Sequence, residues 1–148
     1  MKLSKFYRAH FLAVTFIIFS GTCSAENPGT PETPLFITGT TKVSAEQVIE
    51  LANEYPNLTI VDSRIEGDRQ KGYIESSISL PDIKTNCKSL AKVIPKKETV
   101  SLFYCNGVNC GRSVVAIKIA LKCGYKNLYW FRGGFEVWLK NGLPYMKD

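Results

Sequence analysis

The sequence feature that most constrains the fold is a short apolar run that ends abruptly in a cysteine. The run, residues 100–104, leads directly into Cys105, and a loop with two glycines then leads into Arg112-Ser113, where a helical pattern begins. The free N–H groups and the positive dipole end of a helix N-terminus stabilise an anion, and they favour the nucleophilic thiolate over the thiol. The sequence therefore predicts that Cys105 is the reactive group of an enzyme; a buried structural cysteine is the alternative.

Strand-like and helix-like segments alternate along the rest of the chain. Ser44-Ala-Glu-Gln47 is a capping box, and Gly124 stands where a helix C-cap is expected. Such alternation predicts an α/β fold with a mainly parallel sheet and helices on both faces, and ligands bind such sheets beyond the carboxyl ends of the strands. Expected helices span 44–55, 85–94, 113–122 and a short stretch after Gly133-Gly134, and expected strands span 58–61, 78–80, 99–104 (central) and 128–131.

The N-terminus has the pattern of a secretory signal. Three basic residues precede the apolar run 11–19, which is too short to span a bilayer, and small residues lead up to Ala25. We expect a signal peptide at 1–25, cleaved after Ala25, and a periplasmic or secreted protein with no stable membrane span after cleavage. A retained membrane anchor and a lipoprotein modified at Cys23 are the alternatives.

Composition indicates one globular domain and a mild charge. Residues 26–41 are rich in proline, glycine and threonine and predict a linker or N-terminal arm, and 42–148 then form the domain. The signal removes three of 19 basic residues, which leaves 16 against 13 acidic residues, a formal charge near +3. That charge is too small and too dispersed to predict nucleic-acid binding, but it is compatible with a small anionic substrate.

Four cysteines remain after the signal: Cys87, Cys105, Cys110 and Cys123. An exported chain meets an oxidising compartment, and four cysteines allow three pairings, among which the sequence does not choose. A Cys87–Cys123 disulfide is one of them, although Cys123 reads first as a packing residue at a helix end. No zinc pattern occurs and the only histidine, His10, lies in the signal, so we expect neither a metal nor another cofactor.

Three blocks in the right order and spacing give the chain its resemblance to the single-domain rhodaneses, over residues 36–146. The blocks are Val61-Asp62-Ser63-Arg64 with Gly72-Tyr73-Ile74 and Ile78-Ser79-Leu80-Pro81; Tyr104-Cys105 with Gly111-Arg112-Ser113; and 128–134 with Trp138.

The resemblance implies a sulfurtransferase that works by double displacement. Cys105 would take a sulfane sulfur from a small anionic donor such as thiosulfate, and a thiol or cyanide-type acceptor would remove it from the persulfide. Asp62 and Arg64 would form a structural pair or brace the loop. Two loop glycines would turn the backbone amides inward, and Arg112 would add a positive charge near the donor's oxygens. The implied substrate-binding loop is Asn106, Gly107, Val108, Asn109, Cys110, Gly111 and Arg112.

The loop departs from the pattern it resembles. A common form of the family has arginine five residues after the cysteine, whereas Arg112 follows Cys105 by seven, and Cys110 lies inside the enlarged loop. Cys110 is either a small loop residue, or a resolving cysteine for the persulfide, or a partner of Cys105 in a reversible disulfide. A thiol-disulfide or anion reductase, a non-catalytic binding module and a phosphatase are therefore alternative functions.

Overall fold

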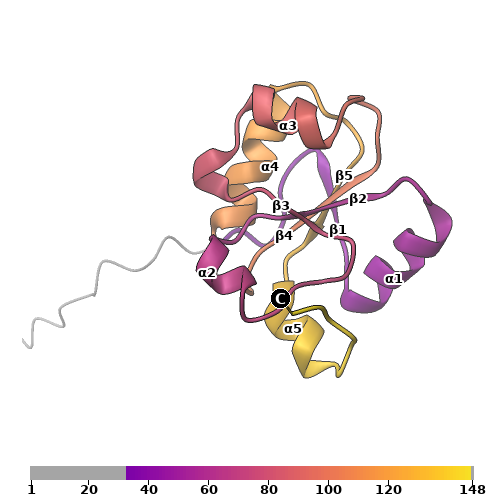
Figure 1. Ribbon diagram of the computed structural model, residues 1–148. Helices are drawn as coiled ribbons and strands as arrows, with labels where there is room; N and C mark the ends of the chain where they lie inside the picture. Colours follow the sequence, from indigo (N-terminus) through magenta and orange to yellow (C-terminus); the bar gives the residue numbers. More distant parts are fainter. Residues whose placement is uncertain (1–32, 148) are drawn as a thin grey trace, which may run out of the picture.

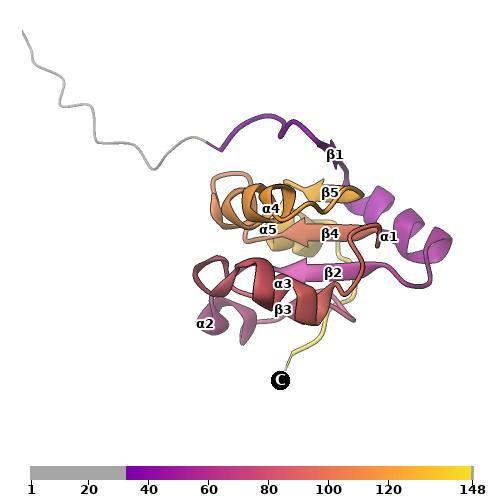
Figure 2. The same cartoon turned by 90° about the horizontal axis from the view of Figure 1, so that it is seen from above.

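The computed structural model describes residues 33–147, and it shows an α/β fold built on a five-stranded, all-parallel sheet (Figure 1). The predicted signal peptide and residues 26–32 of the predicted linker lie outside the described residues. The strand order is β1-β5-β4-β2-β3, and Figure 2 shows the arrows of β5, β4 and β2 side by side and pointing the same way. The strands are β1 (Thr40–Lys42), β2 (Thr59–Asp62), β3 (Ile78–Ser79), β4 (Ser101–Tyr104) and β5 (Leu128–Phe131).

Strand β4 occupies the middle of the sheet, as its unbroken apolar character predicted. All four of its residues are buried, and it pairs with β2 on one side and β5 on the other. Asp62 and Tyr104 are register partners at the carboxyl ends of β2 and β4. The residues that follow these two strands, Ser63 and Cys105, therefore meet at one edge of the sheet.

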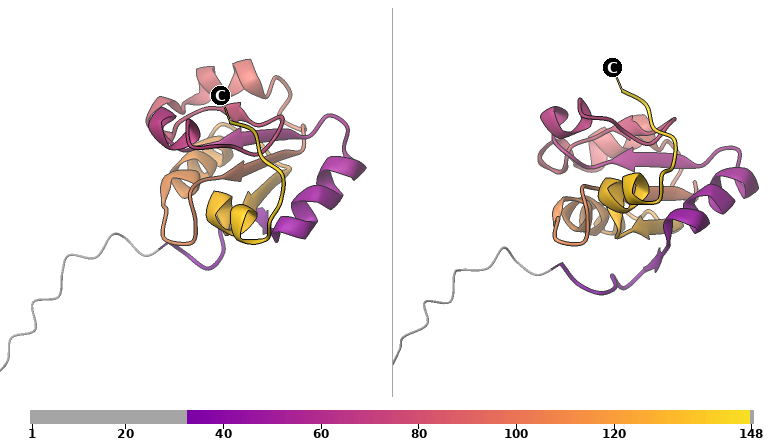
Figure 3. Two further views of the ribbon diagram at one scale, coloured as in Figure 1. Left: turned by 60° about the horizontal axis from the view of Figure 1, so that its bottom comes forward. Right: turned by 90° about the horizontal axis from the view of Figure 1, so that it is seen from below.

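Helices cover both faces of the sheet, and the predicted helices are confirmed to within two residues at each end. Helices α3 (Cys87–Val93) and α4 (Arg112–Lys122) pack on one face, and α1 (Ala45–Glu54) and α5 (Gly134–Lys140) pack on the other (Figure 3). The capping box at Ser44 is present, and Gly124 has the expected positive φ of 85° after α4. Each helix buries one apolar stripe, and the two resulting core clusters pack against opposite faces of the sheet that carries the loop after β4.

Three short elements were missed. Edge strand β1 pairs with β5 and consists of Thr40–Lys42, which the sequence predicted to lie at the boundary between the linker and the domain. A polar edge strand lacks the alternation of buried apolar and exposed polar residues by which a strand is recognised in a sequence. The charged segment 65–72, where no element was predicted, contains the one-turn helix α2 (Glu66–Arg69), and a 3₁₀ turn, η1 (Asp82–Lys84), precedes α3.

A disulfide joins Cys87 to Cys123, with the Cα atoms 5.5 Å apart. It links the first turn of α3 to the residue that ends α4, on the same face of the sheet. The interpretation of Cys123 as a simple packing residue was therefore wrong, because Cys87 lies opposite it within bonding distance. Among the described residues, Cys105 and Cys110 are the free cysteines.

Candidate functional site

Cys105 lies directly after β4, at the carboxyl edge of the sheet, and is 1% exposed. The chain then passes through the loop 106–111 into α4, whose N-cap is Gly111. Within the loop, the amide of Cys110 donates to the carbonyl of Gly107 over 2.9 Å and closes a tight turn. The loop therefore folds back on itself and brings Cys110 towards Cys105.

The start of the loop is held by helix α5. The amides of Phe135 and Glu136 donate hydrogen bonds of 2.9 and 2.8 Å to the carbonyls of Cys105 and Asn106. This close approach requires a glycine at 134, where φ is +59° and a Cβ atom would overlap the backbone of both loop residues. Two successive peptide units of the loop are therefore fixed by a helix from the far end of the chain.

The two loop glycines act differently from the prediction. Neither Gly107 nor Gly111 has a positive φ, so neither is needed for an unusual backbone turn. Instead, the carboxylate of Glu136 occupies the space that a side chain at Gly107 would fill. The absence of a side chain at Gly107 thus allows α5 to lie close against the loop.

The sulfur of Cys105 has polar neighbours on two sides. Its Sγ lies 2.9 Å from the carbonyl oxygen of Cys110 and 3.2 Å from the hydroxyl of Ser113. The indole N–H of Trp130 donates to that hydroxyl over 3.0 Å, which leaves the Ser113 proton free to point at the sulfur. The backbone amide of Ser113 also favours the Cys105 thiolate. Ser113 and Trp130 are buried, so this arrangement is fixed before any substrate arrives.

The thiols of Cys105 and Cys110 shift each other's pKa, and Cys110 is the one that favours the thiolate. The Cys105 thiol and the amides of Arg112 and Asn106 lower the pKa of Cys110 to about 6. The hydrogen bond to Cys110, together with burial, raises the pKa of Cys105. In the resting pair the more exposed sulfur of Cys110, which has more amide donors, therefore favours the thiolate, and the role of Cys105 as the reactive group stays a prediction.

Arg112 does not point freely into the loop. Its guanidinium lies 3.1 Å from the carboxylate of Asp82 in η1, and its side chain is 34% exposed. Its positive charge nevertheless contributes to lowering the pKa of Cys110 and of Asp68. Arg112 thus lies close enough to act on an anion in the loop, but a carboxylate already partly neutralises it.

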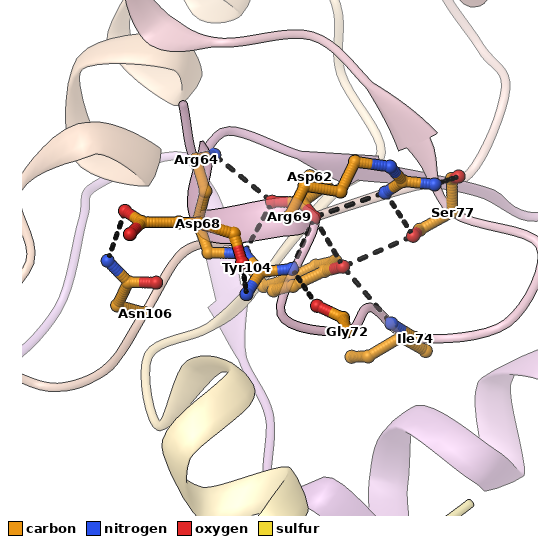
Figure 4. Close-up of polar contacts among 9 residues, drawn as sticks. All are labelled: Asp62, Arg64, Asp68, Arg69, Gly72, Ile74, Ser77, Tyr104 and Asn106. Carbon is orange, nitrogen blue, oxygen red and sulfur yellow. Dashed lines mark hydrogen bonds and ion pairs between the residues drawn. The ribbon is translucent and has the colours of Figure 1, made fainter. Parts of the chain in front are cut away.

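Asp62 and Arg64 form the buried pair that the sequence predicted as a brace (Figure 4). Arg64 Nη2 lies 2.7 Å from Asp62 Oδ2, and both side chains are at most 1% exposed. Asp62 also accepts hydrogen bonds from Arg69 (3.1 Å) and from the hydroxyl of Tyr104 (2.9 Å). Burial raises the pKa of Tyr104, so its hydroxyl stays protonated and donates. Since Tyr104 precedes Cys105, this network fixes the end of the strand that carries the cysteine.

Asp68 of α2 contacts the loop, and nothing in the sequence pointed to it. The side-chain amide of Asn106 donates to Asp68 of α2 over 2.9 Å, as Figure 4 shows, and this bond lowers the pKa of Asp68. The hydroxyl of Ser63 is buried and has no hydrogen-bond partner among the described residues. Asp62, Ser63 and Arg64 come at the end of a predicted strand and so pointed to this edge of the sheet. Asp68 lies in α2, a helix that was not predicted.

The tip of the loop contacts the N-terminal arm. The hydroxyl of Thr33 bonds to the carbonyl of Val108, and Arg132 donates to the carbonyl of Pro34 over 2.9 Å. Two shallow hollows of about 390 and 330 Å³ flank this contact, with Arg132 in the wall of both. A separate cavity of about 300 Å³ lies over α1 and shares no residue with the loop, so it does not belong to the candidate site.

Among the described residues, no helix is long and apolar enough to cross a membrane, and no three potential metal ligands cluster together.

The chain was compared with known protein families and with known proteins. Residues 44–141 match the model of the rhodanese-like domain. An uncharacterized protein from Buchnera aphidicola subsp. Baizongia pistaciae is 28% identical over 104 residues, which are 69% of each chain.

Solved structures agree with the fold. A Bacillus halodurans protein superimposes with a TM-score of 0.64 at 24% identity, covering 73% of this chain and 77% of the other. Thiosulfate sulfurtransferase from Pseudomonas aeruginosa gives 0.63 at 25% identity, where 73% of this chain matches only 20% of that longer one. The polysulfide-sulfur transferase homodimer from Wolinella succinogenes gives 0.59 at 23% identity, over 74% and 80%.

Proposed function

The chain belongs to the rhodanese-like domain family, and from this membership we propose that it is an exported sulfurtransferase. In this proposal Cys105 takes the sulfane sulfur of a small anionic donor such as thiosulfate and passes it, as a persulfide, to a thiol or cyanide-type acceptor. Two similar structures bear the names of sulfur transferases, which supports the reaction class.

One observation carries the proposal: Cys105 stands at the carboxyl end of the central strand, where amides of the loop and of the first turn of α4 act on its sulfur and on that of Cys110. The amide of Ser113 favours the Cys105 thiolate, and the amides of Asn106 and Arg112 favour that of Cys110. Preorganised donors of this kind stabilise negative charge that develops on sulfur during transfer.

The chemical steps follow from this arrangement. The Cys105 proton passes to the hydrogen-bonded Cys110 thiolate, and the Cys105 sulfur attacks the outer sulfur of thiosulfate. The S–S bond of the donor breaks, sulfite leaves with the electron pair, and Cys105 becomes a persulfide. An acceptor nucleophile then attacks the outer sulfur of the persulfide and returns Cys105 to its starting state.

The test is a steady-state assay with thiosulfate and cyanide, in which thiocyanate is measured. Cys105→Ser should reduce turnover by at least about 1,000-fold, because the nucleophile is lost. Val115→Ser, a change on the exposed side of α4, serves as the matched control and should retain full turnover. Unchanged turnover in Cys105→Ser would remove the proposal, and a folded wild type that forms no persulfide with any donor would favour a non-catalytic binding module.

A thiol-disulfide or anion reductase is the second candidate, favoured by the hydrogen-bonded Cys105–Cys110 pair. It requires the pair to cycle between dithiol and disulfide with a defined potential when no sulfur donor is present. Equilibration against glutathione buffers, read by thiol alkylation, tests it; thiols that stay free at all ratios would exclude this candidate.

Export is part of the proposal. It is supported by the N-terminal pattern at 1–25 and by the Cys87–Cys123 disulfide, since such bonds persist mainly in oxidising compartments. Cell fractionation and N-terminal sequencing of the full chain, expressed in a bacterium, test it. We expect a periplasmic or secreted protein that begins at Glu26, and an uncleaved cytoplasmic chain would contradict export.

A further inference from the structure

The candidate site holds two free thiols, of which the proposed transfer uses only Cys105 as its nucleophile. Cys105 and Cys110 are both free, whereas the other two described cysteines are bonded to each other. The Cys105 thiol donates to the backbone carbonyl of Cys110 over 2.9 Å, and the two thiols shift each other's pKa. The loop therefore holds both cysteines in one cluster, and a bond between their sulfurs requires a local rearrangement of that loop.

The two thiols differ in their access to solvent. Cys105 is 1% exposed, and the hydroxyl of Ser113 lies against its sulfur, whereas Cys110 is only partly buried. A persulfide on Cys105 would be sheltered from large acceptors. Cys110, by contrast, touches both the buried sulfur and the loop surface.

We propose that Cys110 discharges the persulfide internally: it attacks Sγ of Cys105, expels hydrosulfide and leaves a Cys105–Cys110 disulfide. This inference rests on the proposed sulfur transfer and gives Cys110 a second role in it.

The step balances without any added reactant. The persulfide anion on Cys105 and the thiol of Cys110 give one disulfide and one hydrosulfide ion. The bond between Cys105 Sγ and the outer sulfur breaks, its electron pair leaves with the outer sulfur, and the proton of Cys110 leaves with it. The outer sulfur is reduced to the sulfide level as the two cysteines are oxidised.

The surroundings of Cys110 suit it to this step. The amides of Arg112 and Asn106 favour the Cys110 thiolate, and both are still present when Cys105 carries a persulfide. A thiolate is the attacking form in thiol–disulfide exchange. The turn from Gly107 to Cys110 holds the attacking residue in the same loop as its target.

The difference in burial also determines which sulfur of the disulfide an external reductant attacks. An external dithiol reductant is needed to reopen the disulfide for the next cycle. Because Cys110 is the more exposed of the two, the reductant would attack its sulfur and release Cys105 as the leaving thiolate, in place for the next donor. An exported enzyme of this design would convert a sulfane donor and a dithiol into hydrosulfide.

The test is a single turnover of the full chain after mild reduction that leaves the Cys87–Cys123 bond intact. Thiosulfate is added without acceptor under argon, and hydrosulfide and intact mass are followed. Wild type should release about one equivalent of hydrosulfide and end as a Cys105–Cys110 disulfide, about two hydrogens lighter than the dithiol. Cys110→Ser should accumulate a persulfide about 32 Da heavier on Cys105 and release hydrosulfide at least about 100-fold more slowly.

Two further variants serve as controls. Cys110→Ala repeats the test without a hydroxyl, and Val115→Ser, on exposed α4 surface, should behave as wild type. Circular dichroism checks that each variant is folded.

The possible failures are distinguishable. A stable wild-type persulfide with no hydrosulfide, or release by Cys110→Ser at the wild-type rate, overturns the role of Cys110 and leaves the proposed transfer standing. No persulfide and no hydrosulfide in any variant overturns the transfer itself, and the role of Cys110 falls with it.

Discussion

The amide of Phe135 donates a hydrogen bond of 2.9 Å to the carbonyl of Cys105, so the C-terminal helix directly holds the residue proposed as the nucleophile. The guanidinium of Arg64 stacks on the ring of Phe135, 4.4 Å from its centroid, and pairs with Asp62. One residue of α5 thus connects the loop to the buried ion pair under the strand ends.

Gly134→Ala should disturb the loop more than the fold. An added Cβ would overlap the backbone of Cys105 and Asn106, and a positive φ is unfavourable for alanine. We expect a loss of stability of roughly 1–3 kcal/mol and a larger relative loss of sulfur transfer. Urea unfolding and the thiocyanate assay measure the two effects.

Gly124→Ala is the matched control for that substitution. Gly124 also has a positive φ, of 85°, but nothing lies within 4 Å of an added Cβ. It should lose about 1 kcal/mol of stability and retain transfer activity. Equal losses of activity in both variants would show that contact with the loop is not what makes Gly134 necessary.

Asp62→Ala should be severely destabilising. Asp62 is fully buried and accepts charge-assisted hydrogen bonds from Arg64 and Arg69. Its removal leaves the buried guanidinium of Arg64 without a carboxylate partner. We expect a loss of roughly 3–5 kcal/mol in urea unfolding. Lys71→Ala, which removes an exposed ion pair with Asp68, should stay within about 0.5 kcal/mol, and comparable losses would refute the buried-pair argument.

Asp68→Ala should act on the loop rather than on stability. Its carboxylate accepts a hydrogen bond from Asn106 and is partly exposed. We expect slower persulfide formation, because the first turn of the loop loses a support, and a change in unfolding free energy below about 1 kcal/mol. Stopped-flow measurement of sulfite release tests this; a rate equal to that of wild type would show that the bond is dispensable.

Removal of the disulfide should lower stability and leave chemistry intact. The bond closes a loop of 36 residues, so the chain-entropy estimate for Cys87→Ala/Cys123→Ala is a loss of roughly 3–4 kcal/mol. Thermal unfolding measures the loss, and transfer at 25 °C should be unchanged. Thiol titration of native wild type should find two reactive cysteines in the described domain, and four would contradict the bond.

Alkylation of the loop thiols should depend on pH in a defined way. Because the pKa of Cys110 is lowered to about 6, its thiolate predominates above that pH and is lost as the pH falls through it. Iodoacetamide should therefore modify Cys110 first, with a midpoint near pH 6. In Cys105→Ala the stabilising hydrogen bond is gone and the midpoint should rise; an unchanged midpoint would exclude coupling of the thiols.

Local sequence was sufficient for most of the architecture. The capping box at Ser44, the glycine after α4 and the apolar run of β4 each act through neighbouring residues, so each could be read directly. The two-residue strand β3 was found through its flanking proline, whereas polar β1 was missed because an edge strand needs only a partner, here β5.

The sequence by itself determined that Cys105 ends a central strand, and that a loop with a second cysteine leads from it into a helix. It did not determine which sulfur holds the negative charge, because that depends on amides and a buried hydroxyl brought together around the loop. Nor did it determine the Cys87–Cys123 pairing or the support from α5, since both join residues separated by 30 or more positions. Only the packing of helices on a twisted parallel sheet sets those distances, and they decide how the loop can react.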